Sequence, residues 1–449
     1  MIYTYSNNRT LKYSTPLIDY IKNNNLYSNE NLMYTRKYTD GTFSITNPTS
    51  NYKNSELVNG YPHFHIPLEI IMNEIEFFIN ECTMYDNNIL IRYGDTHPHK
   101  PVPKLGQIRN LVINNSLSSM IGSNATSYFV IGDISIKSLN YFKEKYDLDI
   151  EGEKLFIDIV NNNLDQAVKE LLDTFNKDAL IQIQEFLKKA NLDASRFYIE
   201  SDLYNNQELY KEFKNDPKYK TELKKNGELK YTLQEMMFIC SHLKNQRDCL
   251  INIIGSNQSE HIKKVNNILL QSNKGLDVRF LSYGMCNNAE SNNYEQWSLK
   301  IQEYIYHRQI KQLSSYMNHN DFLKALMIIN KNDMALDFDD LDKHINDINR
   351  FNGFIDSISL ADKSAKNVHD TNDLLCKMAL VCYNLNRAIE MGNPNMFYRY
   401  LLSVANEYES HKDQYKDLSG LYYDFICSGM KRLGYPIFEH KEGKRMVLK

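Results

Sequence analysis

The stretch KPVPKLGQIRNLVINNSL, residues 100–117, decides how this chain of 449 residues folds. Its proline-rich approach ends at Gly106, and polar and apolar residues then follow one another with a helical period. Glycine allows a close approach of the backbone, and the N–H groups at a helix N-terminus attract anions. The stretch therefore predicts a turn between a strand and a helix that can hold a phosphate group.

Short apolar runs on both sides of this turn predict buried strands. One run, residues 89–93, precedes the turn, and another, residues 128–133, follows the helix. Further strand signals come at residues 196–199 and 249–254. Since strands that alternate with helices form parallel sheets, the sequence predicts an α/β domain.

Helical periodicity dominates the segments around this domain. We expect a helix at residues 67–81, two helices inserted into the sheet domain at residues 164–190, and helices almost throughout beyond residue 296. Residues 38–50 (YTDGTFSITNPTS) are turn-like in composition. The predicted domains are residues 1–86, of mixed periodicity; 87–295, the sheet domain with a helical insertion near 150–195; 296–362, a helical connection; and 363–449, a compact helical domain.

The composition is that of an ordinary globular protein. Hydrophobic residues make up 42% and charged residues 24%, and a net charge of −4 gives no overall attraction to nucleic acid. Basic residues gather only at 211–225 and 440–449, and such clusters are usually solvated faces. Seven cysteines without C-x-x-C spacing and the lack of an apolar run of about 18 residues lead us to expect a cytoplasmic protein that does not cross a membrane.

The order of residues within the opening stretch resembles the signature of class I arginyl-tRNA synthetases. The matching residues, after a Lys-Pro pair, are Gly106, Arg109, Ile113, Asn115 and Leu117. Four further segments resemble the same family in the same order, so the resemblance covers about residue 88 to the end. It implies a class I synthetase-like Rossmann (HUP-type) parallel sheet domain followed by a helical bundle like the anticodon-binding domain, for which residues 335–340, 393–412 and 430–439 match.

The turn at Gly106 departs from the family's pattern. The family carries H-x-G-H there, which binds ATP, and here Lys104 and Gln107 stand at the two histidine positions. Lys and Gln can still donate hydrogen bonds to phosphate, but the paired imidazoles that favour pentavalent phosphorus are lost. The resemblance places Gly255 and His261 on the same nucleotide side.

The segment NGELKYTLQEM, residues 226–236, resembles the part of the family that contacts the substrate guanidinium. Tyr231 and Glu235 hold the matching places, and residues four apart share one face of a helix. A carboxylate suits a guanidinium because it accepts two parallel N–H donors. The alternative is that Glu235 serves the helix dipole in the first turns.

Two more segments add residues to the amino-acid side. RFYIESDLY, residues 196–204, supplies Glu200 and Ser201, and IIGSNQSEHIKKV, residues 253–265, supplies Gln258 next to the nucleotide-side His261. The alternatives are a solvent-facing pair at a strand end for the first and a structural helix histidine for the second.

Two further departures concern charge. Arg92 stands where the family has a glutamate, and His97 where it has an asparagine. A cation beside a guanidinium pocket is unfavourable, so either Arg92 turns away or the ligand is not free arginine. The family's mobile K-M-S-K-S-like loop is replaced by residues 286–297 (CNNAESNNYEQW), and there is no Lys or Arg between Arg279 and Lys300.

Three hypotheses follow from the resemblance. We favour a diverged arginyl-tRNA synthetase-like protein that binds arginine, an arginine-like ligand or arginyl-tRNA, with adenylation lost or altered; its chemistry, if any, would be arginyl transfer or specialised metabolism. The alternatives are an active ATP-dependent arginine–tRNA ligase and a non-catalytic scaffold or regulatory subunit. The resemblance implies ATP and Mg²⁺ as the only cofactors, and it assigns no catalytic residue and no metal ligand.

Overall fold

The computed structural model describes most of the chain, in several ranges. These are residues 2–5, 13–24, 31–34, 42–46, 56–58, 61–86, 88–190, 192, 196–225, 228–243, 249–255, 258–272, 276–283, 324–328 and 372–435. The lysine-free segment 286–297, the segment 335–340, the basic tail and most of the helices expected beyond residue 296 lie outside them.

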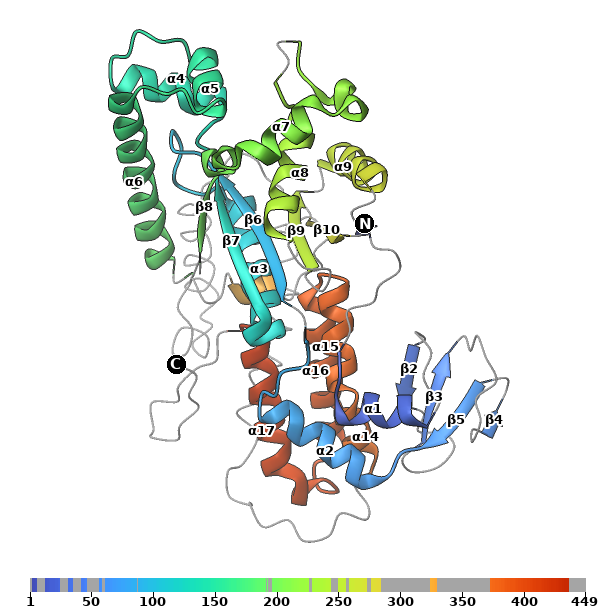
Figure 1. Cartoon of the computed structure of the whole chain (residues 1–449). Helices are drawn as coiled ribbons and strands as arrows, with labels where there is room; N and C mark the ends of the chain where they lie inside the picture. Colours follow the sequence, from blue (N-terminus) through green and yellow to red (C-terminus); the bar gives the residue numbers. More distant parts are fainter. Residues whose placement is uncertain are drawn as a thin grey trace.

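A six-stranded sheet forms the centre of the molecule (Figure 1). Its order is β1-β10-β9-β6-β7-β8, in which the five strands from β10 to β8 run parallel and β1 pairs antiparallel with β10. The strands are β1 (Ile2–Tyr5), β6 (Ile89–Thr96), β7 (Ala125–Ile131), β8 (Phe197–Ile199), β9 (Cys249–Gly255) and β10 (Asp277–Tyr283). The predicted parallel α/β sheet is confirmed; β1 and β10 were not predicted.

The chain reverses its direction of travel across the sheet at β6. It passes from β6 to β7 and β8 on one side and then returns to β9 and β10 on the other. In open α/β sheets such a switch point leaves a crevice outside the carboxyl ends of the two central strands, and ligands bind there. The carboxyl ends of β6 and β9 are therefore where a site is expected.

Helices cover both faces of the sheet because the strands alternate their side chains between two apolar layers. On one face, Ile91, Tyr93 and Ile253 pack with α3 (Leu105–Ile121). On the other, Leu250 and Phe280 pack with α8 (Tyr231–His242) and α9 (Ser259–Ser272). The helix predicted behind Gly106 is α3, and it begins where that turn was expected.

The connection from β7 to β8 holds the helical insertion. It consists of α4 (Ile136–Lys145), α5 (Gly152–Val160) and α6 (Gln166–Lys189). The prediction of two helices within residues 164–190 was wrong, because α6 is one continuous helix of 24 residues. Asp165 caps its start by accepting from the Ala167 N–H at 2.9 Å, and no Pro or Gly interrupts it.

The N-terminal residues build a second, smaller sheet and two helices. The sheet has the order β2-β3-β5-β4, with β2 (Asn31–Tyr34), β3 (Thr42–Thr46), β4 (Glu56–Val58) and β5 (Tyr61–His65). The turn-like reading of residues 38–50 was wrong for Thr42–Thr46, where Thr, Phe and Ile favour a strand. The predicted helix at 67–81 is α2 (Leu68–Ile79), and α1 (Pro16–Asn23) packs beside it.

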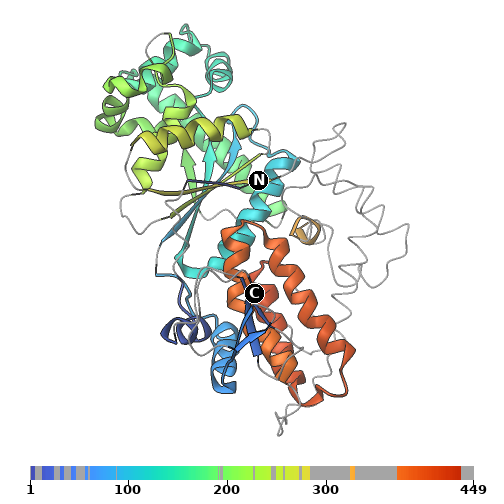
Figure 2. The ribbon, with the colours of Figure 1, turned by 90° about the vertical axis from the view of Figure 1, so that its right-hand side faces the viewer.

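The C-terminal helices form a bundle that joins α2 and α3 to one core (Figure 2). They are α14 (Asn372–Ala379), α15 (Val381–Glu390), α16 (Pro394–Ser410) and α17 (Ser419–Arg432). The Phe78 ring of α2 lies 6.2 Å from the Phe397 ring and 5.4 Å from the Phe425 ring. Ser116 of α3 donates to the Leu433 carbonyl at 2.6 Å, so the bundle packs against α3 of the sheet domain.

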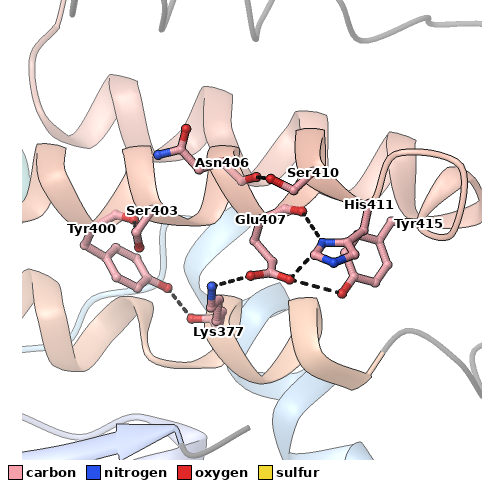
Figure 3. Close-up of polar contacts among 8 residues, drawn as sticks. All are labelled: Lys377, Tyr400, Ser403, Asn406, Glu407, Ser410, His411 and Tyr415. Atoms are coloured by element: carbon pink, nitrogen blue, oxygen red, sulfur yellow. Dashed lines mark hydrogen bonds and ion pairs between the residues drawn. The ribbon is translucent and has the colours of Figure 1, made fainter.

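A buried carboxylate ties three parts of the bundle together (Figure 3). Glu407 of α16 accepts from Lys377 Nζ of α14 at 2.5 Å and lies 3.1 Å from His411 Nδ1. The Tyr415 hydroxyl donates at 3.4 Å to Glu407 Oε1, the same oxygen that faces His411. A buried charge with several polar partners fixes how helices are placed rather than adding much net stability. None of the helices within the described ranges is long and apolar enough to cross a membrane.

Candidate functional site

A cleft lies at the switch point, at the carboxyl ends of β6 and β9. Its volume is about 520 Å³, including its open mouth. Its lining comes from β6, the first turns of α3, β7, the residues after β8, the start of α8, β9 and β10. The lining residues are Arg92, Gly94, Gln107, Asn110, Val130, Glu200, Tyr231, Asn252, Ile253, Ile254, Gly255, Gln258 and Tyr283.

Most of the residues predicted from sequence meet at this cleft. Those that line it are Gln107, Glu200, Tyr231, Gly255 and Gln258. Glu235 lies buried beneath the lining, and His261 packs against Tyr231. Lys104, Gly106 and Ser201 are not in the lining.

The first turn of α3 forms one wall. Lys104 occupies the N-cap and is exposed, and its backbone N–H donates to Gln107 Oε1 at 2.7 Å. The Gln107 carbonyl oxygen is thereby used to cap the helix. A Cβ added at Gly106 would meet no atom within 4 Å, so the glycine leaves the turn open.

Gly94 shapes the β6 end of the cleft. Its φ of +78° lies in the region that only glycine adopts easily, and the β6–β7 register shifts between Tyr93 and Thr96. A Cβ there would lie 3.0 Å from the Phe129 ring. The irregularity interrupts the regular β6–β7 pairing just after Tyr93.

Arg92 and Glu235 form an ion pair at the floor of the cleft. Arg92 Nη1 donates to Glu235 Oε2, and Asn252 Nδ2 donates to Glu235 Oε1 at 2.6 Å. Arg92 and Asn252 are register partners on neighbouring parallel strands, so both point to the face that α8 covers. Both carboxylate oxygens of Glu235 are therefore occupied by side chains of this chain.

The ion pair is buried. The side chains of Arg92 and Glu235 are 11% and 2% exposed. Burial by itself would lower the pKa of Arg92, but the Glu235 carboxylate outweighs this and raises it above its usual value. The Arg92 guanidinium carbon also lies 4.6 Å from the centre of the Phe238 ring, which adds a cation–π contact. Of the two alternatives for Arg92, turning away is excluded by this geometry.

Tyr231 and His261 stand at the rim. Their ring centres are 4.7 Å apart with planes 38° from parallel. Burial lowers the pKa of His261, with the Arg92 charge adding to this and Glu235 partly opposing it. His261 is consequently the neutral ring that supports Tyr231 near neutral pH.

A second hollow adjoins the cleft and shares Glu200 and Tyr231 with it. Its volume is about 560 Å³, and its other lining residues are His97, Ile134, Ser135, Ile136, Phe156, Lys224 and Gln234. We name it the side hollow. Glu200 and Tyr231 form the partition between the two spaces.

Ser201 helps to hold in place the residues that lie behind Glu200 and Tyr231. Its backbone N–H donates to Asp133 at 2.9 Å, and Asn176 Nδ2 of α6 donates to the other carboxylate oxygen at 2.9 Å. Burial raises the pKa of Asp133 to about 6. These contacts fix the residues after β8 and α6 against the end of β7.

The described residues contain no group of three or more His, Cys, Asp or Glu side chains placed to hold a metal ion.

The comparisons with known proteins decide the fold. No family model matches the chain, and no curated protein matches it by sequence. The solved arginyl-tRNA synthetase of Plasmodium falciparum superposes with a TM-score of 0.66 at 14% identity, covering 96% of this chain and 99% of that one. That of Thermus thermophilus gives 0.62 at 11% identity, covering 94% and 98%. The chain has an arginyl-tRNA synthetase-like fold.

This arginyl-tRNA synthetase-like fold confirms the predicted Rossmann-like sheet followed by a helical domain. What the sequence reasoning missed are Asn252 and Phe238, which complete the surroundings of Glu235. An asparagine inside the otherwise apolar strand CLINIIG was a usable signal, because a buried amide needs a polar partner. Phe238 carried no such signal, since phenylalanine on an amphipathic helix is ordinary core.

Proposed function

We propose that this arginyl-tRNA synthetase-like protein binds RNA of the tRNA type, with its cleft facing the RNA end, and no longer forms an aminoacyl adenylate. The observation that carries the proposal is the first turn of α3. Lys104 is exposed there, and the acceptor end of Gln107 caps the helix. Neither supplies the paired imidazoles that would stabilise the phosphorus transition state.

A cluster of lysines supports a polyanionic partner. It lies on α7 (Gln207–Asn215), on the short helix Pro217–Glu222 and on the segment before α8. Lys224 of this cluster also lines the side hollow. The exposed members are Lys211, Lys218, Lys220, Lys224, Lys225 and Lys230. Exposed lysines beside a hollow suit the phosphate backbone of a nucleic acid.

Arginine itself is the less favoured ligand, since both oxygens of Glu235 are already engaged by Arg92 and Asn252. An arginyl-transfer reaction meets the same obstacle, because the arginyl side chain would need the same carboxylate. A non-catalytic scaffold would have no need of the open cleft, so the cleft favours a binding role over the scaffold.

Two assays test the proposal together. The protein is incubated with ATP, labelled pyrophosphate and each amino acid, with and without tRNA, and tRNA binding is measured by filter retention across a salt series. We expect no amino-acid-dependent exchange, and RNA binding that weakens steeply with salt. Robust exchange would show that the protein forms an aminoacyl adenylate and would overturn the proposal, and the absence of both activities would favour the scaffold.

A further inference from the structure

We propose that Arg92 fills, from within the chain, the place that a ligand guanidinium would take on Glu235, and that it thereby excludes arginine from the cleft. This inference rests on the proposed function, because it concerns the ligand of the same cleft. It makes Arg92 a specificity-determining residue.

The surroundings of the Arg92 guanidinium supply a carboxylate and an aromatic face, while Arg92 Nε has no hydrogen-bond partner among the described residues. Glu235 supplies a carboxylate, and Asn252 holds that carboxylate in place from the other side at 2.6 Å. The Phe238 ring, 4.6 Å away, supplies a face on which a flat cation can stack. A carboxylate and an aromatic face are the two features that recognise arginine in preference to lysine.

Arg92 also separates this site from the cleft. Arg92 is part of the cleft lining, whereas Glu235 and Phe238 are not. Arg92 therefore lies between the cleft and the Glu235 carboxylate. Because Arg92 is tethered to β6, its effective concentration at Glu235 gives it an advantage over a free amino acid that competes for the same carboxylate.

The rest of the lining contains the neutral amides Gln107, Asn110 and Gln258 and one carboxylate, Glu200. Amide groups donate and accept hydrogen bonds without compensating a ligand charge. Away from Glu200, the cleft therefore offers a ligand hydrogen bonds but no negative charge for a guanidinium.

The test removes Arg92 and supplies the guanidinium from solution. Thermal unfolding of wild type, Arg92→Ala and the double variant Arg92→Ala/Glu235→Gln is followed with arginine, with methylguanidinium and with lysine as a control cation. We expect both guanidinium compounds to raise the Tm of Arg92→Ala by about 2–4 °C at concentrations about tenfold above the Kd. Wild type and the double variant should not respond, and neither should any protein with lysine.

Arg92→Ala leaves a buried carboxylate without its cation, so Arg92→Gln provides a second, milder opening of the site. If neither guanidinium compound stabilises either variant, or if arginine stabilises the wild type equally, the proposal is overturned. The pyrophosphate exchange assay separates this outcome from failure of the proposed function. Exchange with an amino acid other than arginine would end the proposed function and leave the role of Arg92 intact.

Discussion

The two walls of the cleft differ in what they offer to a ligand. At the floor, the Glu235 carboxylate is buried and accepts hydrogen bonds from both Arg92 and Asn252. At the start of α3, Lys104 is exposed and Gln107 lines the opening. A residue that matches the family's pattern in sequence therefore need not face a ligand. The partners of Glu235 lie inside the chain, while the start of α3 is the wall that remains open.

The largest expected effect comes from breaking the buried pair. Glu235→Ala leaves the Arg92 guanidinium buried and unpaired, so we expect a loss of about 3–5 kcal/mol in the free energy of unfolding. Replacing both, as Arg92→Met/Glu235→Leu, should recover most of this loss. Urea unfolding followed by circular dichroism measures both variants. A loss below about 1 kcal/mol for Glu235→Ala would show that the pair is not buried in solution.

Gly94→Ala tests whether the stability of the protein depends on the irregular end of β6 beside Arg92. At a φ of +78° and with the Phe129 ring 3.0 Å from the new Cβ, we expect a destabilisation of about 2–3 kcal/mol. Gly106→Ala is the matched control on the open wall, because a Cβ there meets no atom within 4 Å. An equal effect of the two changes would remove the distinction between the walls.

Measuring the free energy of unfolding across a pH series tests the role of Asp133, the carboxylate behind Glu200 and Tyr231. The pKa of Asp133 is about 6 in the folded protein against 3.8 ordinarily, so the folded state holds its proton over a wider range. Wild type should therefore lose on the order of 2 kcal/mol as the pH rises from about 4 to about 6, relative to Asp133→Asn. In that variant Asn176 can turn its amide so that its oxygen accepts from the introduced side-chain amide. Parallel pH profiles of the free energy of unfolding for the two proteins would contradict the expected loss in the wild type.

The smallest effects are expected at the open turn. Gln107→Ala removes the acceptor for the Lys104 N–H and should cost about 0.5–1 kcal/mol. Lys104→Ala should change stability by less than about 0.5 kcal/mol, because the side chain is exposed. If the proposed RNA contact is made there, Lys104→Ala should nevertheless lower the salt slope of RNA binding. Thermal melts and filter binding on the same samples separate the two effects.

The sequence predicted the elements that carry the site because strands and helices repeat with their own periods. The strands around the turn, α3 and α8 were found in this way, and the spacing of Tyr231 and Glu235 placed them on one helix face. The continuous α6 was expected as two helices, although no helix-breaking residue lies between Gln166 and Lys189. Thr42–Thr46 was missed because its strand depends on partners in β2 and β5.

The sequence alone did not predict which side chain pairs with Glu235. Arg92 was an evident departure, but its direction depends on the register of β6 with β9, which places it beside Asn252. Pairing between strands that lie far apart in the sequence is not encoded locally. The ion pair on which the proposed exclusion of arginine rests could therefore be identified only from the structure.

The most direct measurement is a calorimetric titration of arginine into the wild-type protein. Because Arg92 and Asn252 already occupy both oxygens of Glu235, we predict no saturable heat up to about 10 mM arginine. Saturable binding of arginine with a Kd below about 1 mM, abolished by Glu235→Gln, would contradict the account.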